Sequence, residues 1–195
     1  MLWRILNKKE LRLYIKQKGH SYQFFVNDDK EEAFTGFWDR KRKVGLFGKI
    51  LSSEKEELVS VNLSNSPFFW NLNKTEYKIL LHRESTEITL KAVNAYKGHW
   101  TFLYGTDSYD FYFHQGHKKS LFRNGNQVAK HDKGKVNFWD YDSGFIVADN
   151  EENKLLLLAL FLTFDMGESM DGDINIDLGN LMAGVKSYDS NWYPK

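Results

Sequence analysis

Short runs in which apolar and polar residues alternate recur along the first three quarters of the chain. In residues 11–16, leucine or isoleucine at every second position alternates with arginine, tyrosine and lysine. A period of two predicts a β-strand with one face in the core and the other in solvent. The same pattern predicts about a dozen strands, at residues 11–16, 22–26, 33–38, 44–51, 58–63, 77–81, 88–92, 100–104, 109–113, 120–123, 126–130, 136–139 and 145–148.

The pattern changes after residue 150. Residues 155–164 read Leu-Leu-Leu-Leu-Ala-Leu-Phe-Leu-Thr-Phe, which are mostly unbranched helix formers. Asn150 or Asn153 could cap this helix, with acidic residues in or near its first turn. The helix would be apolar on every side, so it has to be surrounded by other elements.

The many strands and the single apolar helix together predict one architecture. About eight strands close a barrel that side chains can fill, and about a dozen leave a wider lumen. An α-helix is about 10 Å across and would fill that lumen. We therefore expect an all-β fold (α+β by helix content): a closed antiparallel barrel of about twelve strands enclosing one central hydrophobic helix. The 195 residues are expected to form a single domain, residues 1–195.

The tail of the chain has a weaker pattern. Isoleucine and leucine alternate with polar residues at 173–178, which could form a last strand. Residues 181–185 could be a short helix or a strand. We expect Trp192 and Tyr193 to pack back onto the body of the domain.

Composition narrows the classes of function. The chain has 27 basic and 26 acidic residues, whereas a nucleic-acid-binding protein usually has a basic excess, so no nucleic-acid partner is expected. The absence of cysteine excludes disulfides and thiolate chemistry and suits a reducing compartment. The first ten residues do not have the pattern of a signal peptide. The longest apolar run is too short to span a bilayer. We therefore expect a cytoplasmic protein with no integral membrane segment.

Several segments, in their order along the chain, resemble a known family. They are Tyr109-Asp-Phe-Tyr-Phe-His, Ser120-Leu-Phe-Arg-Asn-Gly-Asn-Gln-Val-Ala-Lys130, Phe145-Ile-Val-Ala, and the hydrophobic helix ending in Asp165. This order is similar to the tubby C-terminal-like superfamily, in particular its bacterial and plant LURP-one-related branch and the phospholipid scramblases. The resemblance is clearest over about residues 76–166 and implies a twelve-stranded barrel threaded by a helix.

The family also implies a class of ligand. Its members include phosphoinositide-binding tubby domains, lipid scramblases and plant defence-related proteins. The tubby phosphoinositide site has no residue-by-residue counterpart here. The scramblase cysteine cluster and calcium motif have none either. The resemblance therefore implies mainly a fold, and it assigns no site residues.

Two basic groups are the candidate site for anionic phospholipid headgroups. Arg40, Lys41, Arg42 and Lys43 form a run at a predicted turn. A second group gathers around the predicted Asn124-Gly125 hairpin and comprises Lys118, Lys119, Arg123, Lys130, Lys133 and Lys135. Each cation near a charged membrane surface contributes about 1 kcal/mol. The alternative is that these are solvated turns that keep the barrel soluble.

Metal and enzyme signatures are weak. His114, His117 and His131 could gather around a metal, but no carboxylate stands at a recognisable spacing. The Asp171-x-Asp-x-Asn run begins like a calcium loop, but Ile176 stands where that loop requires glycine. No common catalytic motif is present. We expect no cofactor and no resident metal.

The favoured hypothesis is a non-enzymatic tubby-like domain that binds anionic phospholipid headgroups or a protein partner, with a peripheral membrane location in the first case. The alternative is a lipocalin-like carrier of small molecules, which needs an open lumen. A hydrolase is the third candidate.

Overall fold

The computed structural model describes residues 10–27, 29, 31–41, 45–65, 74–114, 118–133, 142–170 and 186–195. Strands follow one another along the chain and one long helix comes last. The strands are β1 (Glu10–Lys18), β2 (Ser21–Val26), β3 (Phe34–Lys41), β4 (Gly45–Ser52), β5 (Glu57–Asn65), β6 (Glu76–Leu81), β7 (Thr86–Asn94), β8 (His99–Tyr104), β9 (Asp107–His114), β10 (Lys118–Arg123), β11 (Asn126–Lys133) and β12 (Asp142–Asp149). Two short 3-10 helices, η2 (His82–Glu84) and η3 (Ala95–Lys97), lie in turns, and the helix is α1 (Lys154–Met170).

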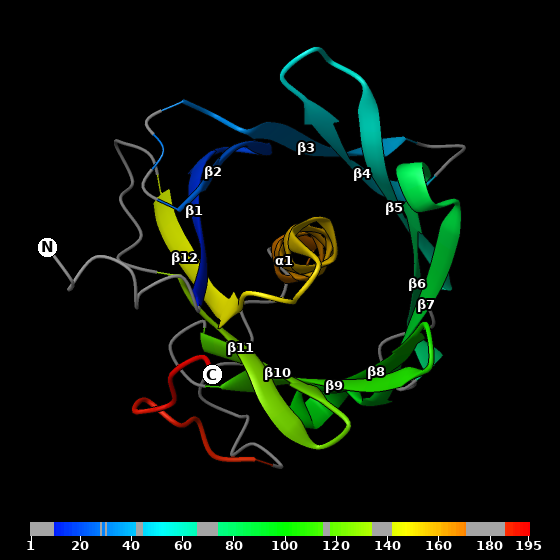
Figure 1. Cartoon of the computed structure of the whole chain (residues 1–195). Coiled ribbons are helices and arrows are strands. Elements are labelled where there is room, and N and C mark those ends of the chain that lie inside the picture. The colour runs from blue at the N-terminus through cyan, green and yellow to red at the C-terminus, as the bar shows by residue number, and fades with distance from the viewer. Residues whose placement is uncertain are drawn as a thin grey trace, which may run out of the picture.

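The twelve strands close into an antiparallel barrel. Each strand pairs with its neighbours in sequence, and β1 pairs with β12 from Glu10↔Asp149 to Gln17↔Asp142. Closure leaves no strand edge unpaired. The expected all-β barrel around one helix is confirmed (Figure 1). The strands expected at 136–139 and 173–178 lie outside the described residues, as does the element expected at 181–185.

Because the strands run alternately up and down, successive turns lie at opposite ends of the barrel. We call the end where α1 begins the proximal end and the end where α1 finishes the distal end. The β2–β3, β4–β5, β6–β7, β8–β9 and β10–β11 turns lie at the proximal end. The last residues of β1, β3, β5, β7, β9 and β11 lie at the distal end.

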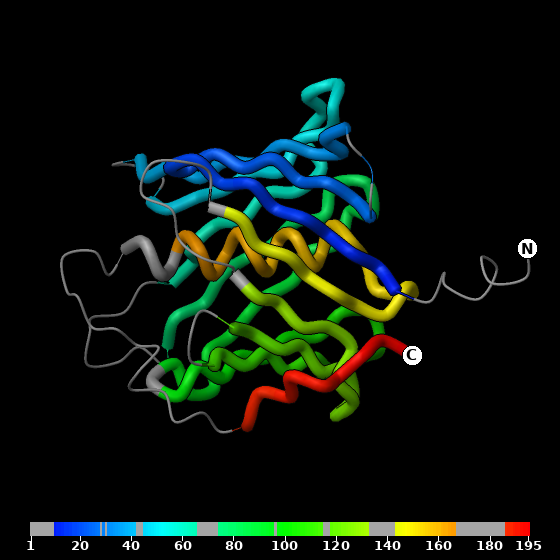
Figure 2. The backbone as a smooth tube through the Cα atoms, turned by 90° about the vertical axis from the view of Figure 1, so that its left-hand side faces the viewer, coloured from blue at the N-terminus to red at the C-terminus, as the bar shows by residue number. Residues whose placement is uncertain are grey.

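Helix α1 runs along the inside of the barrel (Figure 2). Residues 156–166 are all buried, as expected for a helix with no polar face. Asn153 is its cap, because the Asn153 Oδ1 accepts from the N–H groups of Leu155 at 3.0 Å and Leu156 at 3.3 Å. The first turn itself holds no acidic residue, and the acidic residues expected in or near it are Glu151 and Glu152, just before the cap. Within the described residues, no helix is long and apolar enough to cross a bilayer.

The helix packs closely on part of the wall formed by β3 to β6. A Cβ added at Gly48 on β4 would lie 2.9 Å from both the Leu162 Cδ2 and the Met166 Sδ. Glycine at this position therefore allows the strand backbone to approach the helix.

Residues 186–195, which we call the C-terminal strap, lie on the outside of the barrel (Figures 1 and 2). The Lys130 Nζ on β11 donates to the carbonyl oxygens of Ser190 at 3.2 Å and Trp192 at 2.8 Å. The same amine lies 6.0 Å from the Trp192 ring and 5.0 Å from the Tyr193 ring. Trp192 therefore contacts the body of the domain as expected, whereas Tyr193 stays largely exposed.

Candidate functional site

The first basic group lies at the distal end, where β3 ends. Arg40 and Lys41 are exposed, and the Lys41 Nζ lies 5.1 Å from the Phe47 ring. Arg42 and Lys43 lie outside the described residues. The two described members of this group therefore face solvent at the rim of the barrel.

The second basic group is divided by the barrel wall. Side chains on a strand alternate between faces, so Lys118 points outward and Lys119 points inward. Lys119 is only 3% exposed, and its strand partners are Phe113 and His131 on the inner face. Lys118 is half-buried on the outside, 3.9 Å from the Asp132 Oδ2 and 5.1 Å from the Tyr188 ring of the strap. The wall therefore keeps these adjacent lysines apart.

Arg123 lies at the proximal end, away from both lysines. Its Nη1 is 3.1 Å from the Oε1 of Glu152, whose side chain is 1% exposed. The Tyr109 hydroxyl donates to the Glu152 Oε2 at 3.3 Å. Burial raises the pKa of Glu152 and, with the nearby carboxylate, raises the pKa of Tyr109 to about 12. Arg123 thus holds the segment that leads into α1.

Charge is segregated along the barrel axis. Exposed cations at the distal end, among the described residues, are Lys18, Arg40, Lys41, Lys74 and Lys97. Exposed carboxylates at the proximal end, in the same part of the chain, are Asp29, Glu31, Glu54, Glu56, Glu84 and Glu151. The separation is incomplete, since Asp39 lies at the distal end, and Lys55, Arg83 and Lys154 are exposed at the proximal end. The near-zero net charge conceals a basic distal end and an acidic proximal end.

His114 lies on the outer face, beneath the strap. It is 8% exposed, its Nε2 lies 2.6 Å from the Ser120 Oγ, and its ring centroid is 5.2 Å from that of Tyr188. Burial lowers its pKa to about 4. His131 lies on the inner face instead, 5.1 Å from Phe161, and His117 lies outside the described residues. The wall therefore separates the two described histidines of the metal hypothesis.

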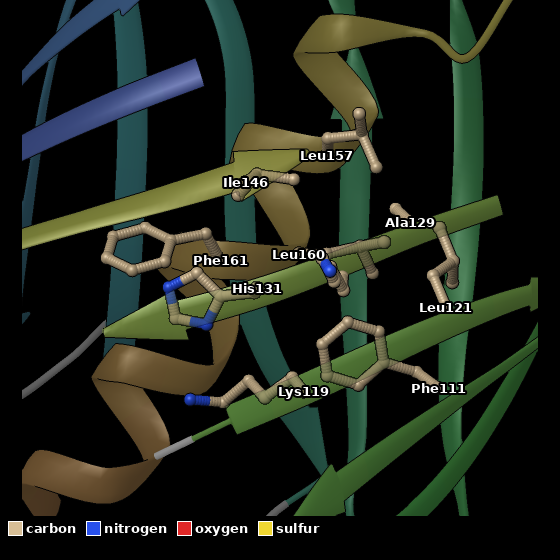
Figure 3. Close-up of a pocket in the computed structure, with 10 residues that line it drawn as sticks. Phe111, Lys119, Leu121, Ala129, His131, Ile146, Leu157, Leu160 and Phe161 are labelled. Atoms are coloured by element: carbon tan, nitrogen blue, oxygen red, sulfur yellow. The ribbon is translucent and has the colours of Figure 1, made fainter. Parts of the chain in front are cut away.

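A small cavity lies between the wall and the helix, beside Lys119 and His131 (Figure 3). Lys130 also lines it, and its remaining lining residues are apolar and include Phe111, Leu160 and Phe161. Its volume is about 20 Å³, enough for roughly one water molecule. A cavity of this size does not accommodate a lipid or a small-molecule cargo.

Asp165 lies in the distal part of α1. It is 3% exposed, and its Oδ2 accepts from the Tyr22 hydroxyl and, at 2.9 Å, from the Gln17 Nε2. It therefore fastens α1 to β1 and β2. The run from Asp171 that resembles a calcium loop lies outside the described residues. In the part of the chain that the structure describes, no three His, Asp or Glu side chains form a metal-binding group.

Sequence reasoning missed the distal set of cations because its members lie far apart along the chain. Lys18, Lys74 and Lys97 stand on separate turns and form no run. The signal that could have found them is the alternation of turns between the two ends of an up-and-down barrel.

Comparison of the chain with models of known families, with curated proteins and with solved structures finds no match in any of the three.

Proposed function

We propose that this protein is a non-enzymatic, tubby-like domain whose distal end binds the surface of a membrane containing anionic phospholipids. The observation that carries the proposal is an excess of charge of opposite sign at the two ends. Among the described residues, the exposed cations Lys18, Arg40, Lys41, Lys74 and Lys97 outnumber the exposed carboxylate of Asp39 at the distal end, and exposed carboxylates outnumber exposed cations at the proximal end. A molecule with this distribution is oriented by a negative surface, with its basic end facing the lipid.

The size of the effect follows from the charges. Each lysine or arginine near an anionic surface contributes about 1 kcal/mol, and the attraction decays within a Debye length. Several cations at one end suffice for reversible, salt-sensitive attachment. The cations stand on separate turns, so the interaction depends on surface charge density more than on the shape of one headgroup. The proposed location is the cytoplasmic face of a membrane, which suits a chain without cysteine.

The runner-up function, a lipocalin-like carrier, needs space inside the barrel. Leu156, Leu158 and Leu160 are at most 1% exposed, and the cavity beside the helix has room for roughly one water molecule. These observations favour the surface-binding proposal over the carrier.

The test is co-sedimentation with vesicles of phosphatidylcholine alone or mixed with phosphatidylglycerol, over a salt series. We expect binding to the anionic vesicles that weakens as salt rises. Neutralising two distal cations, as Arg40→Gln with Lys41→Gln, should weaken partitioning about 30-fold, which corresponds to about 2 kcal/mol.

The matched control neutralises two exposed lysines at the proximal end, as Lys55→Gln with Lys154→Gln. This variant has the same net charge as the distal variant, so it separates position from total charge. Equal weakening by both pairs would contradict an oriented basic end. No binding to anionic vesicles at low salt would remove the lipid proposal and favour a protein partner.

A further inference from the structure

The Asn124-Gly125 pair forms the two-residue turn between β10 and β11 at the proximal end of the barrel. Its φ angles are 50° at Asn124 and 80° at Gly125, the backbone conformation that closes a tight hairpin between Arg123 and Asn126. Both residues of the pair are exposed. The sequence contains no second Asn-Gly pair.

An asparagine followed by glycine is chemically labile. The backbone nitrogen of the glycine attacks Cγ of the asparagine, a new C–N bond closes a five-membered imide, and the bond from Cγ to Nδ2 breaks. The proton from the backbone nitrogen leaves with Nδ2 as ammonia. Water then opens the imide to give aspartate or isoaspartate. The reaction needs no cofactor, and glycine favours it because it has no Cβ to obstruct the attack.

The folded barrel holds the Asn124 side chain in contacts that oppose this reaction. Its Nδ2 donates to the Asp107 Oδ1 at 2.6 Å, and its Oδ1 accepts from the Ser108 N–H at 3.0 Å. The Asn124 N–H also donates to the Ser108 carbonyl oxygen at 2.8 Å. The side-chain amide is thus directed to the start of β9, and its bond to a carboxylate is of the stronger kind. Attack by the Gly125 nitrogen makes Cγ tetrahedral and draws it towards the turn, so both side-chain bonds have to break first.

We propose that Asn124 is a latent deamidation site, which Asp107 and Ser108 keep closed while the β10–β11 turn is docked on β9. Ammonia is lost only from molecules in which this docking is released. The fraction of modified chains therefore reports how often the proximal end of the barrel opens locally.

The product of the reaction does not fit the docked turn. In aspartate, an oxygen replaces Nδ2, so a carboxylate meets the Asp107 carboxylate where a donor now lies at 2.6 Å. In isoaspartate, the main chain runs through the former side chain and gains one methylene in a turn of two residues. Either product favours the undocked turn, so the modification maintains the opening that produced it.

The test is prolonged incubation of the full chain at mildly alkaline pH. Mass spectrometry of the proteolytic peptide that contains Asn124 measures the deamidated fraction, and an isoaspartate assay identifies the product. We expect the folded protein to react at least about 30-fold more slowly than a synthetic peptide of residues 118–130, the effect of two hydrogen bonds, one of them to a carboxylate. Asp107→Ala should accelerate the reaction at least about tenfold, since it removes the bond to the carboxylate.

Two control variants separate this contact from charge and from global stability. Glu151→Ala removes an exposed carboxylate at the same end of the barrel, and Gly48→Ala crowds Leu162 and Met166 in the core. Both should deamidate at the wild-type rate, because local opening of the turn governs the reaction. The proposal is overturned if the folded wild type reacts as fast as the peptide, or if either control accelerates the reaction as much as Asp107→Ala does.

Substitution tests the consequence of the modification separately. Asn124→Asp should lower the urea midpoint of unfolding, because it places a second carboxylate against Asp107. Asn126→Asp makes the same chemical change at a side chain that donates to the Asn124 carbonyl oxygen at a longer 3.5 Å, and it should lower the midpoint less. Equal midpoints for the two variants would contradict the misfit of the product. Neither measurement involves lipid, so the outcome is independent of the proposed membrane binding.

Discussion

The buried imidazole of His114 makes stability depend on pH. Its pKa is lowered to about 4 in the fold, against about 6.5 for an unfolded chain. The neutral form is therefore favoured in the fold. Its stabilisation is complete above about pH 6.5 and is lost as pH falls towards 4. We expect the free energy of unfolding to drop by about 2–3 kcal/mol across this window.

Urea unfolding at a series of pH values checks this expectation. His114→Phe should flatten the profile between pH 4 and pH 6.5. The control His20→Gln replaces an exposed histidine and should leave the slope in place. A wild-type profile that is flat over this window would show that His114 is not held neutral.

Arg123 was a candidate ligand for a lipid headgroup, but it pairs with the buried carboxylate of Glu152. Its substitution therefore tests whether its role is structural or lies in binding. Arg123→Met leaves the Glu152 carboxylate buried without its cation, at a cost of about 3 kcal/mol. Thermal or urea unfolding should show this loss, whereas Arg40→Gln should change stability by less than about 0.5 kcal/mol.

The double variant Arg123→Met with Glu152→Gln should recover much of the loss, since the buried group is then neutral. A wild-type-like stability for Arg123→Met would mean that the ion pair contributes nothing. Sequence reasoning placed Arg123 in a basic cluster because it could not see Glu152, which is distant along the chain. By contrast, the placement of Lys118 and Lys119 on opposite faces follows from strand periodicity alone.

At the scale of elements, the start of α1 depends on one side chain. Asn153 caps the helix and also donates through its Nδ2 to the Glu84 Oε1 at 2.6 Å and the Tyr104 hydroxyl at 2.8 Å. Asn153→Ala should therefore lower the free energy of unfolding by about 2 kcal/mol, the upper range for a lost cap. Asn150→Ala, at an exposed turn position, is the control and should be close to neutral. Similar losses for both variants would mean that Asn153 is not the critical cap.

The close approach of β4 to α1 makes a second prediction. Gly48→Ala adds a methyl group that meets Leu162 and Met166 at 2.9 Å, well inside normal contact. Overpacking of this kind costs about 1–3 kcal/mol. Denaturant unfolding measures the loss, and the double variant Gly48→Ala with Leu162→Ala should recover part of it by making room. A Gly48→Ala protein as stable as the wild type would show that the helix shifts freely in the lumen.

The strands and the helix were largely predictable because their patterns are local. A period of two marks each strand, and a run that is apolar on all sides marks an enclosed helix. The choice of Asn153 over Asn150 was left open, since it depends on Glu84 and Tyr104, which lie on other elements. The closeness of Gly48 to the helix was not predictable, because glycine has no side chain that takes part in the pattern.

At the scale of the whole molecule, the order of the turns along the chain decides at which end of the barrel each charged residue lies. Charged residues are distributed over separate short runs along the chain, such as 28–32, 39–43 and 54–57. Closure of an up-and-down barrel brings alternate turns to the same end, and this leaves an excess of exposed cations at the distal end and of exposed carboxylates at the proximal end. The difference in charge between the two ends could therefore be predicted from the sequence and the number of strands. It could not be predicted from composition or net charge.

The barrel has no core without its helix, and this gives the last prediction. Leu158 is 0% exposed at the centre of α1 and is surrounded by wall residues. Leu158→Asp places a carboxylate there without a partner, at a cost of several kcal/mol, comparable to the whole stability of a domain. We expect loss of the cooperative unfolding transition and of near-ultraviolet circular dichroism.

Leu103→Asp makes the same chemical change at a side chain that is 69% exposed on β8, and its free energy of unfolding should stay within about 0.5 kcal/mol of wild type. If Leu158→Asp unfolded as cooperatively as Leu103→Asp, α1 would be an insert in a barrel that is stable by itself. If only Leu158→Asp loses the cooperative unfolding transition, the barrel and the helix form one cooperative unit.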